Sequence, residues 1–214
     1  MKFILFVEGY SEKKALPAFL KRWLDRQLPQ RVGLKIVRFE GWGDYNREVS
    51  KKARVHLNSP GSEDIIAIIG LIDLYGPDIY PGHLTTAKEK YDWGKEDFEK
   101  RVGNSRFRHF FAVHETEAWL LSDPTLFPAD VRTGFPGRVT QPETVNFDEP
   151  PAKLLERLYK ARLKQTYKKV THGKELFDKL DPNTAYAHCP RLRELLDEML
   201  KLAGAALSAS GSET

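Results

Sequence analysis

The sequence predicts an α/β fold, with a parallel sheet of about four strands flanked by helices and a helical C-terminal elaboration. Apolar runs alternate with segments of helical spacing over the first 123 residues, the pattern of strands joined by right-handed helical crossovers. The run at residues 65–72 carries no polar alternation, which is typical of a central strand covered on both faces. Strand-like runs then stop, and helical segments follow.

The chain opens with the apolar run of residues 2–7, which predicts a buried strand. Ser11 is a suitable N-cap for the helix that follows. The apolar side of that helix is Ala15, Leu16, Phe19, Leu20, Trp23 and Leu24. Pro17 removes one backbone donor, and we expect it to bend the helix. Residues 33–40 then predict a second strand, which ends at Glu40.

The middle of the chain supplies two more strands. The loop 41–46, "GWGDYN", precedes a helix that Asp44 is placed to cap. The third strand ends at Asp73, and a charged helix follows over residues 85–102. The fourth strand covers residues 106–115 and leads into a short helix that Pro124 ends.

The last third has a different composition, which defines the predicted domains. Proline, threonine and glycine are frequent between residues 124 and 151, and helices are expected at residues 153–164 and 190–202. We therefore predict an α/β domain at 1–123, a helical extension packed on it at 124–203, and a disordered small-residue tail at 204–214.

Composition narrows the classes of protein. The chain has 34 Lys and Arg against 30 Asp and Glu, a net charge of +4, which permits nucleic-acid binding without requiring it. Its one cysteine, Cys189, forms no disulfide within the chain and fits a reducing compartment. The first apolar run is too short for a signal peptide or a membrane span. We expect a soluble cytoplasmic protein.

Acidic residues stand at the ends of the predicted strands. They are Glu8, Glu40, Asp73 and Glu115, with Glu117 just beyond. Because parallel strands end at one edge of a sheet, we expect these carboxylates to gather there. Clustered carboxylates repel one another unless a cation lies between them, and oxygen ligands favour Mg²⁺ or Mn²⁺. Acids at strand ends also serve as caps or solvated loop residues, the reading we prefer for Glu40.

The same residues carry a family resemblance. "VEGYSE" and "LIDLYG" resemble the Toprim domain of topoisomerases, primases and overcoming-lysogenization-defect nucleases. The chain as a whole resembles the domain of unknown function 4276 family. Its motifs are "FVEG" at 6–9, "DLYG" at 73–76, "HETEAWLLSD" at 114–123, "EPPAKLLE" at 149–156, "YKKVTHG" at 167–173 and "HCPRLREL" at 188–195.

The resemblance implies a Toprim-like, Rossmann-like fold and Mg²⁺- or Mn²⁺-dependent phosphodiester chemistry. Carried across, Glu8 is a metal ligand and a candidate general base, and Asp73 is a second ligand. Glu117 completes the site, with Glu115 as a further candidate. Toprim domains have a second aspartate where this chain has Tyr75, which implies one metal instead of two, or a weakened site.

Other residues near these motifs are weaker candidates. Gly9 lets the chain turn beside Glu8. "HETEA" lacks the second histidine of a zinc-protease helix, so His114 is a secondary candidate. Lys153 could contact a scissile phosphate, or it could be a solvated helix lysine. Cys189 is expected to pack in the core.

The basic segment "YKKVTHGK" is a candidate nucleic-acid contact. Its residues Lys168, Lys169, His172 and Lys174 could follow a phosphate backbone, although charged runs are more often solvated faces. With the family resemblance, these features predict a metal-dependent nuclease (a hydrolase) or a related phosphodiester-processing enzyme, with DNA as the expected nucleic acid. The resemblance adds an ATPase partner protein and a role in defence against foreign DNA. The alternatives are a catalytically degraded nucleic-acid- or protein-binding module and a phosphatase or nucleotide-processing enzyme.

Overall fold

Four parallel strands form a single sheet in the order β2-β1-β3-β4. The computed structural model describes residues 1–144 and 149–211 of the chain. The strands are β1 Lys2–Val7, β2 Gly33–Arg38, β3 Ile65–Asp73 and β4 Phe107–Ala112. Val7 lies opposite both Arg38 and Leu71, so three strands end at one edge of the sheet. The predicted α/β fold is confirmed.

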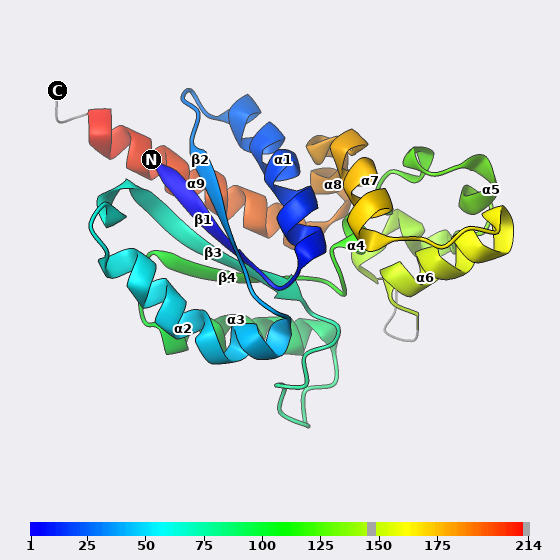
Figure 1. Cartoon of the computed structure of the whole chain (residues 1–214), viewed down its shortest axis with the longest axis horizontal. Helices are drawn as coiled ribbons and strands as arrows, with labels where there is room; N and C mark the ends of the chain where they lie inside the picture. The colour runs from blue at the N-terminus through cyan, green and yellow to red at the C-terminus, as the bar shows by residue number, and fades with distance from the viewer. Residues whose placement is uncertain (145–148, 212–214) are drawn as a thin grey trace.

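Helices surround this sheet and continue beyond its carboxyl edge (Figure 1). The α-helices of the described chain are α1 Tyr10–Gln27, α2 Trp42–Asn58, α3 Ala87–Val102, α4 Glu117–Leu120, α5 Ala129–Arg132, α6 Pro151–Leu158, α7 Lys174–Lys179, α8 Pro182–His188 and α9 Pro190–Gly211. Short 3₁₀ turns are η1 Ser62–Asp64, η2 Pro124–Leu126, η3 Gly137–Thr140 and η4 Pro142–Thr144. Two π-helical turns are η5 Tyr159–Leu163 and η6 Lys169–Gly173.

The two faces of the sheet build two separate cores, because successive side chains of a strand point to opposite sides. Phe3 and Leu5 of β1 pack with α1 and α9, and Ile4 and Phe6 pack with α2 and α3. In Figure 1, α1 and α9 accordingly lie above the sheet and α2 and α3 below it. The first core also takes in the helices of the C-terminal half, so those helices and the sheet share one apolar interior.

Helix and strand boundaries near the carboxyl edge differ from the predicted ones. Helix α1 begins at Tyr10 with Gly9 as N-cap, so Ser11 is not the cap. Its hydroxyl donates instead to Glu12, at 2.8 Å. Strand β4 ends at Ala112, three residues early, because the chain turns there to reach the end of β3. The amide of Thr116 donates to Asp73 Oδ1 at 3.0 Å.

The C-terminal helices also differ from expectation. Helix α6 ends at Leu158 and passes into the π-helical turn η5, where a single continuous helix was expected. Helix α9 continues to Gly211, so residues 204–211 are helical and their prediction as a disordered tail was wrong. The apolar side of α9, with Met199 and Ala203, packs in the first core. Residues 212–214 of that predicted tail lie outside the described residues. Over the described residues, no helix has the length and hydropathy to cross a membrane.

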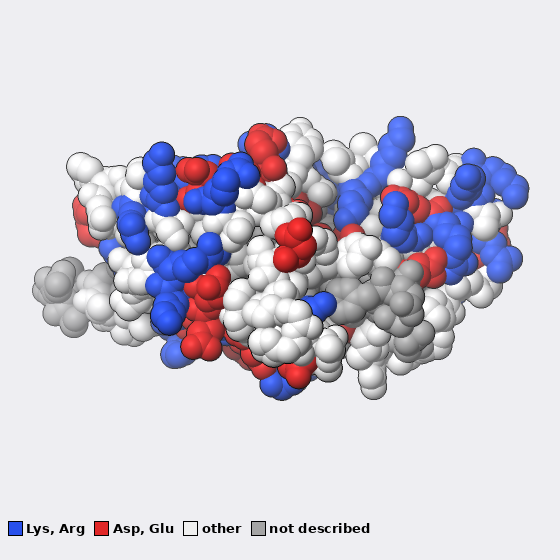
Figure 2. Space-filling view, turned by 90° about the horizontal axis from the view of Figure 1, so that it is seen from below, with Lys and Arg blue, Asp and Glu red and all other residues white. Residues whose placement is uncertain are grey.

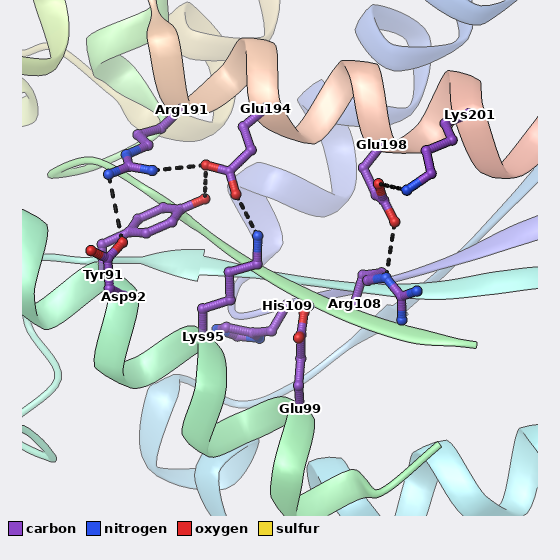
Figure 3. A network of polar contacts seen from close by, with 10 residues as sticks. All are labelled: Tyr91, Asp92, Lys95, Glu99, Arg108, His109, Arg191, Glu194, Glu198 and Lys201. Carbon is purple, nitrogen blue, oxygen red and sulfur yellow. Dashed lines mark hydrogen bonds and ion pairs between the residues drawn. The ribbon is translucent and has the colours of Figure 1, made fainter. Parts of the chain in front are cut away.

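Charged side chains attach α9 to the edge strand β4 and to α3 (Figure 3). Lys95 of α3 pairs with Glu194 of α9, and Arg191 Nη1 lies 2.8 Å from Glu194 Oε2. Arg108 Nε of β4 lies 2.9 Å from Glu198 Oε1. We call this set, with Asp92, Glu99 and Lys201, the α9 network. It fixes the C-terminal helix across the sheet edge.

Candidate active site

Three segments bring acidic side chains to the carboxyl edge of the sheet. Glu8 follows β1, Asp73 is the last residue of β3, and Glu115 and Glu117 follow β4. Glu115 and Glu117 are 7% and 2% exposed, which is rare for carboxylates without a compensating partner. The hydrogen bond from Thr116 to Asp73 holds the last two segments together. The structure therefore places four of the five expected acids at the carboxyl edge, whereas Glu40 is exposed and pairs with Arg38.

Lys169 is the cation that faces this cluster. Its Nζ lies 3.1 Å from Glu115 Oε1 and 3.2 Å from Glu117 Oε2. The turn η6 carries it there, and the amide of Lys168 donates to His172 Nδ1 at 3.0 Å within that turn. Burial works against the charged form of Lys169, but the carboxylates of Glu117, Asp73 and Glu115 outweigh it and raise its pKa above the ordinary value.

Glu115 is tied into the structure through both of its oxygens. Oε1 accepts from Lys169, and Oε2 accepts from the amide of Ala152 at 2.8 Å. These contacts attach the start of α6 and the turn η6 to the carboxyl edge. Of the two acids after β4, Glu117 therefore has more ligand capacity left for another group.

Glu12 is a fifth acid of the cluster, which the sequence analysis missed. It is only 6% exposed. A Cβ on Gly9 would lie 2.7 Å from Glu12 Oε2, so glycine at position 9 makes room for this carboxylate. Its negative charge raises the pKa values of Glu8, Asp73 and Glu117. The available signal was its position in the first turn of the helix that follows Glu8.

Burial makes the negative charge of this cluster costly. Burial, and then the charge of Glu12, raise the pKa of Glu8 to about 7, although backbone hydrogen bonds at Asp73 and Trp42 oppose the shift. Burial likewise raises the pKa of Glu117 to about 7, with Lys169 opposing and Glu115 adding to the shift. Burial, and then the charge of Glu12, raise the pKa of Asp73 well above its usual range. The Lys169 ammonium neutralises only part of the negative charge of these five carboxylates.

The donor set fits a divalent cation in chemistry and charge. Glu8 Oε2 is buried and has no hydrogen-bond partner among the described residues. A void of about 10 Å³ lies between Ser11, Glu12, Glu117 and Lys169, close to the smallest volume that holds one water molecule. Carboxylate oxygens suit Mg²⁺ or Mn²⁺. Within residues 1–144 and 149–211, no three His, Cys, Asp or Glu side chains are already arranged as ligands of one ion.

Comparison with known proteins identifies the family. The family model described as domain of unknown function (DUF4276) matches residues 7–200. The chain belongs to this family. A comparison of this chain with curated proteins found no match. Two solved structures have a related overall form. They are the C-terminal region of the Burkholderia pseudomallei OLD protein and that of the Xanthomonas campestris pv. campestris OLD protein.

The two structural similarities are distant. The Burkholderia structure is 17% identical with a TM-score of 0.48, and the match covers 95% of this chain and 98% of that one. The Xanthomonas structure is 15% identical with a TM-score of 0.49, and the match covers 100% and 97%.

Some predicted site residues lie away from the carboxylates. Lys153 is exposed and pairs with Glu156 at 3.0 Å, so Lys169, and not Lys153, is the lysine at the acids. Glu40 is solvent-exposed and pairs with Arg38. His114 is buried next to Glu115, and burial lowers its pKa.

The lysines predicted to contact nucleic acid point in different directions and do not form one surface. Lys169 turns inward to the acids, Lys168 is exposed, and Lys174 pairs with Asp178. A second basic surface lies on α6 and η5, where Figure 2 shows Lys and Arg gathered at the right-hand end of the molecule. Its exposed residues are Lys153, Arg157, Lys160, Arg162 and Lys164. Arg157, Lys160 and Lys164 also line an open groove of about 810 Å³.

Proposed function

We propose that this protein is a Mg²⁺- or Mn²⁺-dependent nuclease that hydrolyses phosphodiester bonds at the carboxyl edge of its sheet. One observation carries the proposal: five buried or partly buried carboxylates gather there, Lys169 pairs with two of them, and one oxygen of Glu8 has no donor among the described residues. A protein keeps such a costly arrangement where function uses it. The resemblance to Toprim nucleases supports the same chemistry.

In this proposal the residues have distinct roles. Glu8, Asp73 and Glu117 would hold the cation, with Glu12 beside them. A bound Mg²⁺ would polarise a phosphoryl oxygen and acidify a water molecule. Glu8 would also serve as the general base. The Lys169 ammonium would stabilise negative charge that develops on the phosphoryl oxygens.

The substrate and the partner are further parts of the proposal. The exposed basic residues of α6 and η5 are suited to a phosphate backbone, and α6 is joined to the site through Ala152 and Glu115. DNA as the substrate, an ATPase partner and a role in defence are supported by the family resemblance alone.

A binding module without catalysis is the second candidate function. Tyr75 stands in place of the second Toprim aspartate, and it is 41% exposed. Asp78, the nearest acid that could replace that carboxylate, is exposed on the following loop. In this version the basic surface binds nucleic acid and the carboxylates do not hydrolyse it.

The deciding experiment is cleavage of supercoiled plasmid with Mg²⁺ or Mn²⁺. Wild type is compared with Glu8→Gln and with the control Glu40→Gln, which removes an exposed strand-end acid outside the cluster. We expect metal-dependent nicking by wild type and the control, and loss of nicking in Glu8→Gln. Equal nicking by all three would overturn the assignment of the site. Binding without nicking, with or without metal, would favour the second candidate.

A further inference from the structure

Exposed apolar side chains are concentrated at the rim of the carboxylate cluster. Among the described residues, the large apolar side chains that are exposed are Met1, Tyr10, Val55, Tyr75 and Val170. Tyr10 comes two residues after Glu8, Tyr75 two residues after Asp73, and Val170 directly after Lys169. Met1 precedes β1 and Val55 lies near the end of α2, both toward the opposite edge of the sheet. Three of the five therefore adjoin residues of the proposed site.

Tyr10 and Tyr75 each follow one of two neighbouring strands of the sheet. Strands β1 and β3 are parallel neighbours, and Val7 pairs with Leu71, so both chains leave the same edge (Figure 1). Neighbouring strands are about 4.8 Å apart. The amide of Tyr75 donates to the carbonyl of His114 at 2.8 Å, which fixes the backbone there. Tyr10 starts the regular helix α1.

Exposed lysines lie near the rim of the cluster, and one of them contacts Tyr10. The Lys14 ammonium lies 5.3 Å from the centre of the Tyr10 ring. Lys13, Lys14 and Lys168 are exposed. An aromatic face next to lysines is the combination that binds an unpaired nucleic-acid strand, because bases stack on the ring while cations attract phosphates. In a duplex the base faces are covered by their neighbours, so they cannot stack on a side chain.

We infer that this site takes single-stranded nucleic acid, with bases stacked on Tyr10 and Tyr75 and phosphates beside the exposed Lys13, Lys14 and Lys168. The inference deepens the proposed function by naming its substrate class, and it rests on placing nucleic acid at this edge. Tyr75 then has a function of its own at the position where a Toprim domain has an aspartate. Frayed ends, gaps and single-stranded DNA or RNA all present unpaired bases whose faces can stack on a tyrosine ring.

Binding tests the inference without cleavage. A fluorescent twelve-nucleotide oligothymidylate is titrated, in EDTA, with wild type, Tyr10→Ala, Tyr75→Ala and the corresponding Phe variants. The control Val55→Ala shortens an exposed apolar side chain away from the site. We expect each Ala variant to bind roughly 5- to 100-fold more weakly, while the Phe variants and the control stay within about twofold of wild type. A matched duplex is expected to bind less tightly than the single strand.

The outcomes separate this inference from the proposed function. If both Ala variants bind the single strand as wild type does, or if the duplex binds more tightly, the inference is wrong even where plasmid is nicked. If the Ala variants lose binding but no metal supports cleavage, the stacking role stands and the nuclease assignment fails. Thermal melting confirms that the variants, changed at exposed positions, are folded.

Discussion

Two ionic clusters flank the same sheet and are built on opposite principles. In the α9 network (Figure 3), the acids Asp92, Glu194 and Glu198 pair with Lys95, Arg108, Arg191 and Lys201. The remaining acid, Glu99, accepts from the backbone amide of His109 at 3.0 Å. Burial alone would raise the pKa values of Glu194 and Glu198, but hydrogen bonds from neighbouring lysine and arginine side chains lower them below the usual value. At the carboxyl edge, Lys169 pairs with two of the five acids, Glu115 and Glu117. Burial there raises the pKa values of Glu8, Asp73 and Glu117.

The difference in charge balance distinguishes ion pairs that stabilise the fold from carboxylates that serve a function. A balanced network stabilises the charged form of its acids and holds α9 on β4 and α3. An unbalanced cluster is destabilising until a cation enters or protons are taken up. Removing a carboxylate should therefore have opposite effects at the two places: loss of stability in the network, and loss of activity without loss of stability at the carboxyl edge.

The largest effect is expected for Asp73→Asn. The amide oxygen can still accept from Thr116, so the loop after β4 keeps its attachment, but a ligand charge is lost. Metal ions contribute several kcal/mol to such reactions, so we expect single-turnover cleavage to slow roughly 100- to 1000-fold. The metal-free variant should melt no lower than wild type.

Glu198→Gln is the matched change in the α9 network. It should leave the cleavage rate within about twofold of wild type while lowering the melting temperature. If Asp73→Asn cleaved normally and melted early, the comparison between the two clusters would be reversed.

The second effect concerns the cations of the two clusters. Breaking a buried ion pair costs about 3–5 kcal/mol, and the 32% exposure of Lys169 reduces this to about 2–3 kcal/mol for Lys169→Met in EDTA. Mg²⁺ should restore much of that stability, because it replaces the missing positive charge. The measurement is urea unfolding with and without Mg²⁺.

Lys95→Met is the control for this experiment, since Lys95 pairs with Glu194 in the α9 network and is 26% exposed. Its loss of stability should be the same in EDTA and in Mg²⁺. A similar response of both variants to Mg²⁺ would mean that the ion does not act at the carboxyl edge.

Much of the fold was predictable because it follows from local patterns. The four apolar runs predicted four strands, and the uninterrupted run of β3 predicted a central strand. In the structure β3 lies between β1 and β4. Boundaries failed where tertiary contacts outweighed local signals. The tail beyond residue 203 is rich in small residues, yet α9 extends through it because its preceding turns pack in the first core.

The candidate site was predictable only in part. Glu8, Asp73, Glu115 and Glu117 follow from the rule that parallel strands end together. Lys169 could not be placed by that rule, because it reaches the acids only when η6 packs against α1. Whether a basic side chain points to solvent or to buried acids depends on this distant contact.

The pH dependence of stability gives a third, smaller effect. The pKa of Glu8 is about 7 in the folded protein and near 4.5 when it is exposed. Between these values the folded state holds more protons than the unfolded state, so its free energy of unfolding falls as the pH rises. We expect the metal-free protein to lose about 2 kcal/mol between pH 5 and pH 8.

Glu8→Gln should reduce this slope but not abolish it, because the pKa of Glu117 is also about 7. Mg²⁺ should oppose the loss most strongly at pH 8, where the carboxylates are ionised. The α9 network has the opposite sign, because the lowered pKa values of Glu194 and Glu198 give stability that is lost as the pH falls through and below about 4.5. A wild-type stability that rose steadily from pH 5 to pH 8 in EDTA would contradict the raised pKa of Glu8.

The smallest effect is the coupling between Arg108 and Glu198, whose Nε and Oε1 atoms lie 2.9 Å apart. Both side chains are partly exposed, at 29% and 19%, so solvent weakens their attraction. A double-mutant cycle with Arg108→Met and Glu198→Gln should give a coupling energy of about 0.5–1 kcal/mol that decreases in high salt. That value should be the same with and without Mg²⁺, because the pair already neutralises itself. A coupling energy that changed with Mg²⁺ would mean that the two clusters interact electrostatically. The attachment of α9 would then depend on whether a cation is bound at the carboxyl edge.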